Sequence, residues 1–193
     1  PPCQAVVIAL KSRTQETKSA VADSMAAFTW LKEQGAQHLY FKYCSTFDST
    51  KEGNIGPVVD AMLEAFGEKY TILCPALPVN GRTVEHGHLM VNGVPLHESH
   101  MKNHPLTPMW DSSISRLMEP QSQWPCIPME DPSSFSLEKA AEKAGARRFY
   151  IIPDYNTTED GRAIAAAFKS LPLLKGGSGL LEPPARLRSQ EPG

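Results

Sequence analysis

The residues best suited to chemistry lie in one stretch of the chain, residues 40–56 (YFKYCSTFDSTKEGNIG). An apolar run there leads into a loop rich in hydroxyl side chains, with Lys42 and Asp48 supplying opposite charges. Gly53 and Gly56 allow a tight turn or a close approach of the backbone to a ligand. Such a loop can bind a small polyhydroxylated anion, and the charged pair can assist removal of a proton from a hydroxyl.

The same stretch also has a purely structural interpretation. Ser49 or Thr50 can cap a helix that follows the loop, because short hydroxyl side chains accept hydrogen bonds from the free backbone N–H groups at a helix start. Lys42 and Asp48 can form an ion pair that only holds the loop closed. The spacing alone leaves both interpretations open.

Alternating strand-like and helix-like segments predict where these side chains lie. Strands are expected at 5–10, 38–43, 70–74, 147–152 and 171–174. Apolar residues at helical spacing predict helices that end near Gly35 and Gly67, and two more over about 158–170 and 134–145. Strands that alternate with helices predict an α/β fold of three layers around a mostly parallel, Rossmann-like sheet.

Two proline-rich segments interrupt this alternation. Residues 75–110 contain five prolines and an Asn92-Gly93 pair between apolar runs, which predicts a hairpin inserted into the fold. Residues 119–132 are also rich in proline, and their pattern predicts no element.

Composition excludes several classes of function. At 193 residues and 41% hydrophobic content, the chain can bury the core of one domain. With 19 basic and 21 acidic residues, its formal charge of −2 provides no positive field for nucleic acid or an anionic membrane.

No apolar run approaches the ~20 residues that span a bilayer. The four cysteines include no C-x-x-C pair, and the six histidines lack an H-E-x-x-H motif. We expect a cytoplasmic protein with reduced thiols and no metal site.

Five ordered blocks of the sequence carry a resemblance to a known family. They are LKSRT (10–14), FKYCSTFDST (41–50), GNIGPV (53–58), CPALPVNGRTVEHGHLMVNGVPLHES (74–99) and HPLTPM (104–109). Over about residues 5–179 the chain resembles the amino-terminal domain of the four-carbon acid sugar kinases. The resemblance implies ATP-dependent phosphorylation of the terminal hydroxyl of a four-carbon sugar acid, such as 3-oxo-tetronate, threonate or erythronate.

The resemblance also implies a domain organisation. Residues 1–181 are expected to form the substrate-binding domain without the family's first strand, which ends in a D-D-x-T-G-A motif, and residues 182–193 a flexible tail. ATP and Mg²⁺ are expected to be bound mainly by a carboxyl-terminal domain that is absent here, so the chain alone is expected to be inactive. The expected partners are the sugar acid and that ATP-binding domain, with a homodimer as a further option.

Residues that follow the expected strands are the candidate ligand contacts, since ligands bind beyond the carboxyl ends of strands in open parallel sheets. Arg13 is the first choice for the substrate carboxylate, because its guanidinium fork matches two oxygens. The alternative is a surface ion pair with Glu16. Arg82 is the competing carboxylate ligand, with Asn80 suited to bind a hydroxyl, unless this pair only builds an Asn-Gly turn.

The complete set of expected site residues follows from the same resemblance. Asp48 and Lys42 are the expected catalytic residues, Asp48 accepting the hydroxyl proton and Lys42 stabilising negative charge. Substrate binding is assigned to Lys11, Ser12, Arg13, Ser45, Thr46, Asn54, Asn80, Arg82 and His104. The loop of Gly176, Gly177, Ser178 and Gly179 can cradle phosphate with consecutive backbone amides, or merely turn the chain.

Two other functions stay open. The chain can be a standalone or degenerate sugar-acid-binding module without catalytic activity; a downstream nucleotide-binding domain in the reading frame would favour the kinase instead. A dehydrogenase on the same scaffold is opposed by the loop KSRT after the first expected strand, which lacks the glycine fingerprint of dinucleotide sites. No GxxxxGK[ST] motif is present to mark a nucleotide site.

Overall fold

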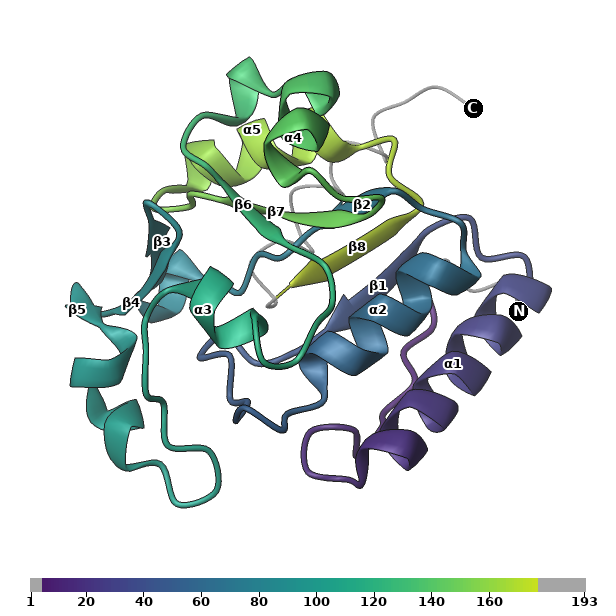
Figure 1. The fold of residues 1–193 in the computed structure, drawn as a ribbon, viewed down its shortest axis with the longest axis horizontal. Helices are drawn as coiled ribbons and strands as arrows, with labels where there is room; N and C mark the ends of the chain where they lie inside the picture. The colour runs from purple at the N-terminus through teal and green to yellow at the C-terminus, as the bar shows by residue number, and fades with distance from the viewer. Residues whose placement is uncertain (1–4, 177–193) are drawn as a thin grey trace.

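The computed structural model describes residues 5–176 and shows an α/β fold (Figure 1). The helices are α1 (Thr17–Glu33), α2 (Ile55–Ala65), α3 (Ile114–Met118), α4 (Leu137–Ala144) and α5 (Thr158–Phe168). The strands are β1 (Leu39–Lys42), β2 (Tyr70–Ile72), β3 (Arg82–Glu85), β4 (His88–Val91), β5 (Val94–Pro95), β6 (Cys126–Met129), β7 (Phe149–Pro153) and β8 (Leu173–Gly176). Short 3₁₀ turns are η1 (Pro78–Asn80), η2 (Leu96–Glu98), η3 (His100–Asn103) and η4 (Pro132–Ser134).

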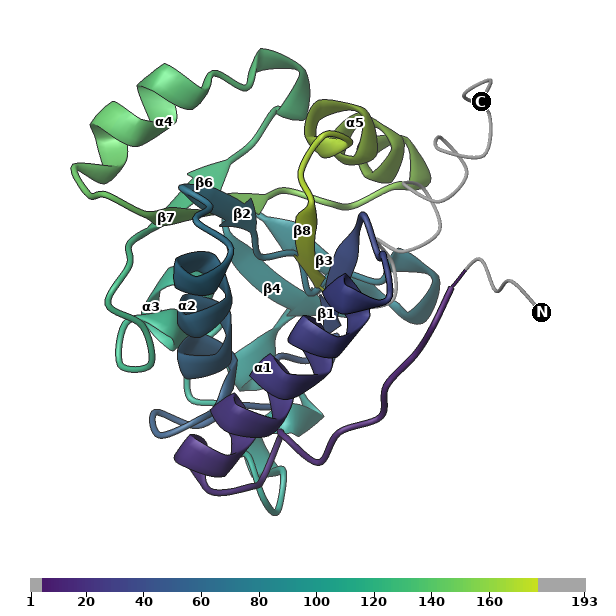
Figure 2. The same cartoon turned by 90° about the vertical axis from the view of Figure 1, so that its right-hand side faces the viewer.

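The central sheet is parallel. β1 pairs with β8, and β7 lies between β2 and β6. A parallel bridge between Cys74 and Gly176 joins the two groups, and the Thr71 hydroxyl donates a hydrogen bond of 2.8 Å to the carbonyl of Leu173. The resulting order is β1-β8-β2-β7-β6. Helices α4 and α5 cover one face and α1, α2 and α3 the other, which gives three layers (Figures 1 and 2).

Burial explains why the helices form and where they pack. In α2, Val58, Val59, Met62 and Leu63 are fully buried, so this helix inserts a continuous apolar stripe under the sheet. The Phe28 side chain of α1 packs edge-on against the rings of Phe41 and Phe66. These contacts hold α1 against α2 and the edge strand β1, next to the loop that carries Asp48.

A small antiparallel sheet decorates the parallel one. Strands β3, β4 and β5 form it, and the turn between β4 and β5 is Asn92-Gly93, with φ of 51° and 76°. Positive φ at both central residues is typical of a type I′ hairpin turn. The hairpin insertion predicted from the Asn-Gly pair is therefore confirmed.

Most of the predicted elements are confirmed, but the strand at 5–10 is wrong. This segment lies outside the sheet alongside α1, and Val7 is 92% exposed (Figure 2). An apolar run becomes a strand only when a neighbouring strand satisfies its backbone groups, and in residues 5–176 no strand does so for this segment. β6 lies within residues 119–132, for which the pattern predicted no element, and α3 lies just before them, where no helix was predicted. None of the helices within residues 5–176 has the length and apolar character required to cross a membrane.

Candidate functional site

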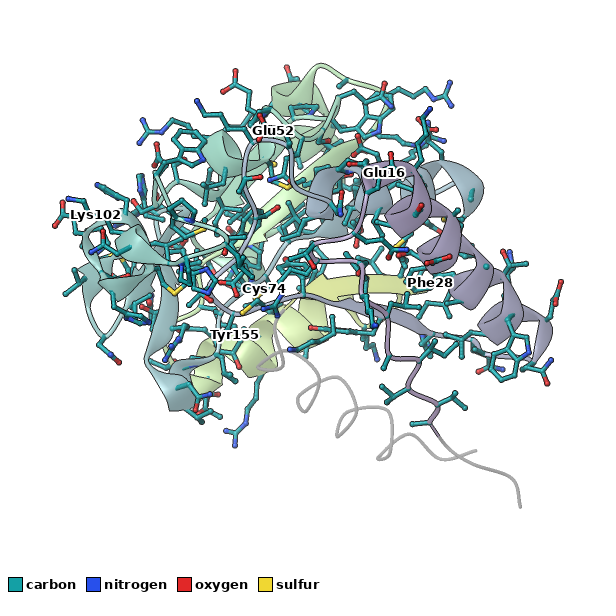
Figure 3. The ribbon with its side chains drawn as sticks, turned by 90° about the horizontal axis from the view of Figure 1, so that it is seen from below. Glu16, Phe28, Glu52, Cys74, Lys102 and Tyr155 are labelled. Atoms are coloured by element: carbon teal, nitrogen blue, oxygen red, sulfur yellow. The ribbon has the colours of Figure 1, made fainter. Side chains whose placement is uncertain are left out.

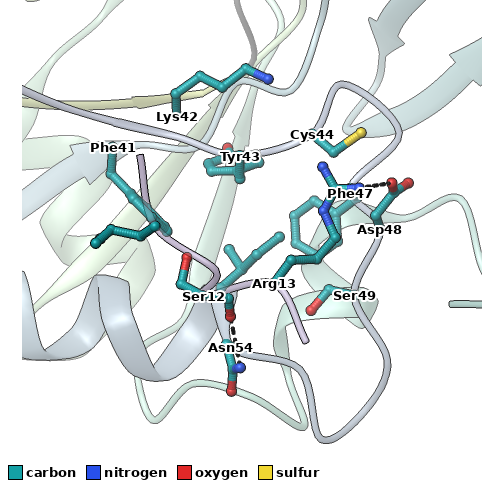
Figure 4. Close-up of a pocket in the computed structure, with 12 residues that line it drawn as sticks. Ser12, Arg13, Phe41, Lys42, Tyr43, Cys44, Phe47, Asp48, Ser49 and Asn54 are labelled. Atoms are coloured by element: carbon teal, nitrogen blue, oxygen red, sulfur yellow. Dashed lines mark hydrogen bonds and ion pairs between the residues drawn. The ribbon is translucent and has the colours of Figure 1, made fainter. Parts of the chain in front are cut away.

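A pocket of about 110 Å³ lies at the carboxyl end of β1 (Figure 4). Three stretches of chain meet there: the segment before α1, the loop after β1, and the start of α2. The lining residues are Leu10, Ser12, Arg13, Phe41, Lys42, Tyr43, Cys44, Phe47, Asp48, Ser49, Asn54 and Ile55. Drug-sized ligands occupy pockets of roughly 300–1,000 Å³. This cavity therefore suits a much smaller molecule.

Asp48 is the carboxylate of the pocket, and its surroundings hold it firmly. It is 6% exposed; its Oδ2 accepts a hydrogen bond of 3.1 Å from Arg13 Nη1, and its Oδ1 accepts one of 2.5 Å from Thr46 Oγ1. The Cys44 sulfur lies 3.1 Å from the same threonine oxygen. A carboxylate has about four acceptor positions, so Asp48 can still accept a hydrogen bond from a ligand hydroxyl.

The backbone that carries Asp48 has an unusual conformation. Phe47 and Asp48 have φ of 64° and 27°, which residues other than glycine rarely adopt. The fully buried Phe47 ring packs edge-on against the Tyr43 ring at 5.9 Å, and this packing holds the turn in place. Such strained residues concentrate at functional sites, where the surrounding structure over-determines them. The geometry therefore supports a functional role for the loop.

Arg13 faces Asp48 across the pocket, as Figure 4 shows. Its side chain is 53% exposed, so donors not used on Asp48 remain available to a ligand. The alternative partner Glu16 instead caps α1, accepting a hydrogen bond from the Ser19 N–H. Arg13 therefore pairs with Asp48 in the pocket, and the alternative surface pair with Glu16 is not formed.

Asn54 lines the pocket, but its side-chain amide forms hydrogen bonds with other residues of the protein. Its Nδ2 donates to the carbonyls of Ser12 and Gln15 at 2.8 and 2.7 Å, and its Oδ1 accepts from Thr17 Oγ1 at 2.9 Å. These bonds tie the segment of Arg13 to the start of α2. Asn54 therefore positions Arg13, whereas the sequence suggested a direct ligand contact.

Lys42 lines the pocket from a different direction. Phe41 and Tyr43 on either side are buried, so strand alternation leaves Lys42 exposed. Figure 4 shows its amino group well apart from Arg13 and Asp48. The ion pair between Lys42 and Asp48 considered from the sequence is not formed, since the carboxylate is paired with Arg13.

Several other expected ligand contacts lie elsewhere in the structure. The Arg82 guanidinium donates to the carbonyl of Asn80, and both residues belong to the hairpin insertion. His104 Nδ1 accepts a hydrogen bond of 3.0 Å from the Thr107 N–H and so closes the turn after η3. Lys11 is exposed beside the pocket residues Ser12 and Arg13. The structure thus does not bring Asn80, Arg82 or His104 to the pocket wall.

The remaining expectations concern the loop before Asp48 and the glycine loop. Ser45 is half-buried outside the pocket wall, and Thr46 supports Asp48 from behind. Gly176 is buried and pairs with Lys42 across β1 and β8. Gly177, Ser178 and Gly179 lie outside the described residues.

Two buried side chains that follow β2 and β1, Cys74 and Tyr43, are poor nucleophiles. Cys74 lies at the centre of the molecule (Figure 3), and burial raises the pKa of its thiol to about 12. Burial likewise raises the pKa of the Tyr43 hydroxyl well above its ordinary value. Both groups therefore stay protonated at neutral pH. Tyr43, Phe47 and Ile55 were not singled out from the sequence, although alternation along β1 could have identified Tyr43.

The turn between β3 and β4 contains His86, which has a carboxylate partner. His86 Nδ1 lies 3.1 Å from Glu130 Oε1, and the Asp154 carboxylate accepts from the N–H groups of His86 and Gly87. The hydrogen bond and charge of Glu130, followed by the charge of Asp154, raise the pKa of His86. Within residues 5–176, no three side chains suited to metal binding lie together.

We expect an NMR titration to give His86 a pKa above its ordinary value of about 6.5. Because the pKa is higher in the folded state, the resulting stabilisation is complete below the pKa of the unfolded chain and is lost as the pH rises through the raised value. Glu130→Gln should return the His86 pKa towards the ordinary value. An identical titration curve in the variant would contradict this assignment.

The fold and the pocket together define a class: an α/β ligand-binding domain in which a carboxylate, a guanidinium and hydroxyl groups meet at the tip of a parallel strand. Comparison with known proteins gives the family. The family described as "Sugar-binding N-terminal domain" matches residues 1–183 of this chain. The chain therefore belongs to this family. The family resemblance expected from the sequence blocks is confirmed.

Individual relatives agree with this assignment. A 3-oxo-tetronate kinase of Brucella melitensis is 47% identical over 191 residues, which cover 96% of this chain and 44% of the relative. The chain therefore spans less than half the length of this curated relative. A crystal structure of a Haemophilus influenzae protein matches with a TM-score of 0.86 at 43% identity, over 95% of this chain and 46% of that one.

A more distant structure shares the fold as well. A Bordetella bronchiseptica protein, crystallised with bound citrate as a domain-swapped dimer, matches with a TM-score of 0.70 at 29% identity, over 91% of this chain and 42% of that one. The expected three-layer α/β fold class is thus confirmed by both solved structures.

Proposed function

We propose that this chain is the substrate-binding half of an ATP-dependent kinase that phosphorylates the terminal hydroxyl of a four-carbon sugar acid. Relatives at 45–48% identity that carry the name 3-oxo-tetronate kinase make 3-oxo-tetronate the first candidate, with threonate and erythronate as alternatives. The observation that carries the proposal is the Arg13–Asp48 pair in a small polar pocket.

Binding follows from the charges of this pair. The exposed side of the Arg13 guanidinium can take the ligand carboxylate through two parallel hydrogen bonds, which are stronger than neutral ones. Only Arg13 Nη1 bonds to Asp48, and a guanidinium has five N–H donors, so a ligand carboxylate can bind the remaining donors without displacing Arg13 from Asp48. The bound citrate of the Bordetella bronchiseptica structure is consistent with hydroxy-acid binding by this family.

Asp48 then orients the hydroxyl groups of the ligand. Its carboxylate is fixed by Arg13 and Thr46 and keeps free acceptor positions, so it can accept a hydrogen bond from a hydroxyl and hold the proton when that hydroxyl reacts. Ser12 and Ser49 line the same pocket and offer further polar contacts. Lys42, at the open side, adds positive charge near the reacting end of the ligand.

The nucleotide is assigned to other residues. ATP would supply the phosphoryl group, with Mg²⁺ stabilising its negative charge. The described part of this chain contains neither a phosphate-binding GxxxxGK[ST] loop nor a group of metal ligands, so its residues do not fit ATP and Mg²⁺ by themselves. We assign both to a carboxyl-terminal domain, and propose that residues 1–181 bind the acid without transferring phosphate when alone.

Calorimetric titration of the purified chain tests the proposal. 3-Oxo-tetronate, threonate and erythronate are compared with two matched controls: butyrate, which lacks hydroxyls, and erythritol, which lacks the carboxylate. We expect at least one sugar acid to bind and both controls to bind at least ~10-fold more weakly, because each lacks one set of charge-assisted contacts. Equal binding of acid and controls, or no binding of any acid, would reject the proposed substrate class.

Transfer is tested separately in a protein that joins this chain to a nucleotide-binding domain. There the bound acid should be phosphorylated in the presence of ATP and Mg²⁺, whereas the chain alone should only bind it. Binding without phosphorylation in both would instead identify a sugar-acid-binding module without catalytic activity.

A further inference from the structure

Gln121 is a buried glutamine whose side chain reaches the pocket loop from the opposite side. It is 9% exposed and follows α3, in the segment for which the sequence predicted no element. Its Oε1 accepts hydrogen bonds from Ser49 Oγ at 3.0 Å and from the Gly56 N–H at 3.2 Å. Its Nε2 donates to the carbonyls of Thr50 at 2.9 Å and Leu117 at 3.2 Å.

These four bonds use every hydrogen-bonding position of the amide. A glutamine amide has two donor hydrogens and two acceptor lone pairs, and here each one has a partner. Turning the amide over would place donors against the Gly56 N–H and an acceptor against two carbonyls, so the network also fixes its orientation. An uncharged amide is therefore specifically required at this position.

Gly56 provides the space for this contact. A Cβ added at Gly56 would lie 2.5 Å from the Gln121 Cβ and would also collide with the Gln121 backbone. The sequence suggested that Gly56 serves a tight turn or a ligand. The structure shows instead that it lets the first turn of α2 contact Gln121.

The backbone beside Gln121 is anchored to the core of the fold. The buried Asp60 carboxylate of α2 accepts hydrogen bonds from Ser122 Oγ at 2.6 Å and from the Gln123 N–H at 3.0 Å. The Tyr150 hydroxyl of β7 donates to the same carboxylate. The bonds to Asp60 thus fix the backbone next to Gln121, while the Gln121 side chain bonds to the pocket loop.

We infer that Gln121 is a positioning residue for the pocket: it fixes the backbone from Ser49 to Gly56 and thereby the placement of Asp48 and Asn54. Asp48 directly precedes the fixed stretch, and Asn54, which holds the segment of Arg13, lies within it. Gln121 itself does not line the pocket. Its effect on ligand binding rests on the proposed function, whereas its effect on the loop does not.

The test compares Gln121→Met with Gln123→Met. Methionine has a similar length but makes none of the four hydrogen bonds. Gln123 serves as the control because it is an exposed glutamine two residues away, and its amide donates to Glu64. Hydrogen exchange by NMR measures the loop without any ligand. We expect exchange of the Gly56 amide to accelerate at least ~10-fold in Gln121→Met, and affinity for 3-oxo-tetronate to fall at least ~10-fold. Gln123→Met should match the wild type in both.

The outcomes separate the two proposals. Unchanged exchange at Gly56 overturns the inference, whether or not any acid binds. Faster exchange in Gln121→Met with no acid bound by the wild type rejects the proposed function and leaves the role in the loop supported. If Gln121→Met shows faster exchange at Gly56 but binds 3-oxo-tetronate as tightly as the wild type, Gln121 does not position the ligand site.

Gln121→Glu provides a second variant if Gln121→Met does not fold. Its carboxylate keeps acceptors for Ser49 and Gly56 but faces the carbonyls of Thr50 and Leu117 without a donor. Protonation at low pH restores one donor, so the Gly56 amide should regain protection on acidification relative to the wild type. A purely space-filling role for Gln121 predicts no such pH-dependent rescue, and its absence would contradict the inference.

Discussion

Replacement of Arg13 by methionine should weaken binding of the four-carbon acid by about 10- to 100-fold. Hydrogen bonds to charged groups contribute about 1.5–3 kcal/mol each, and about 1.4 kcal/mol corresponds to a factor of ten. Arg13→Lys should fall between wild type and Arg13→Met, because it keeps the charge but loses the planar fork. Calorimetry with 3-oxo-tetronate measures all three affinities.

Arg162→Met is the matched control for this prediction. Arg162 is an exposed arginine on α5 that pairs with the exposed Glu159 at 3.1 Å, so its replacement removes an arginine–carboxylate pair of the same length outside the pocket. Its affinity should equal that of the wild type. Asp48 is 6% exposed and loses its cation in this variant, so the free energy of unfolding should fall by about 1–3 kcal/mol, which leaves the chain to be checked for folding before titration. An Arg13→Met chain that is folded and binds the acid normally would remove Arg13 from the site.

Asp48→Asn should reduce turnover of a complete kinase containing this chain by about 10²- to 10⁴-fold, the usual contribution of a positioned acid or base. Asparagine keeps the shape of the side chain, and it tolerates the positive φ of this position better than most residues do. The change removes charge and basicity and leaves one acceptor oxygen where Asp48 has two, so either Arg13 or Thr46 loses its acceptor while the backbone conformation is kept. Steady-state kinetics should show the loss mainly in kcat, with a smaller change in KM.

Asp131→Asn is the control for Asp48. Asp131 is exposed and caps η4 by accepting from the Ser133 N–H, a role that asparagine fills equally well. This variant should retain full turnover. Near-normal turnover in Asp48→Asn would show that Asp48 does not accept the proton, and would leave it only the binding of Arg13 and Thr46.

The sequence predicted the parts of the fold that depend on local pattern. The apolar stripe of α2, the edge strand β1 and the Asn92-Gly93 hairpin follow from spacing and turn chemistry, and the structure contains all three. The segment 5–10 was mispredicted because strand formation depends on a hydrogen-bonding partner, which residue types within the segment cannot reveal.

The candidate site was only partly predictable, for a similar reason. Arg13 and Asp48 are 35 residues apart, and only the order of parallel strands and helices brings them together. The same rule of strand tips placed Arg82 near the pocket, yet this arginine turns back onto the carbonyl of Asn80 within the hairpin. Gln121 is 72 residues from Ser49 in a segment without periodicity, so no local signal indicated it.

A crystal structure of the chain with bound 3-oxo-tetronate would show whether Arg13 and Asp48 form the binding site. We expect the ligand carboxylate within about 2.7–3.2 Å of the Arg13 guanidinium, with a hydroxyl oxygen at hydrogen-bonding distance from Asp48. A ligand bound instead at Arg82 and Asn80, or anywhere that leaves Arg13 and Asp48 without contact to it, would show that this pair is not the binding site.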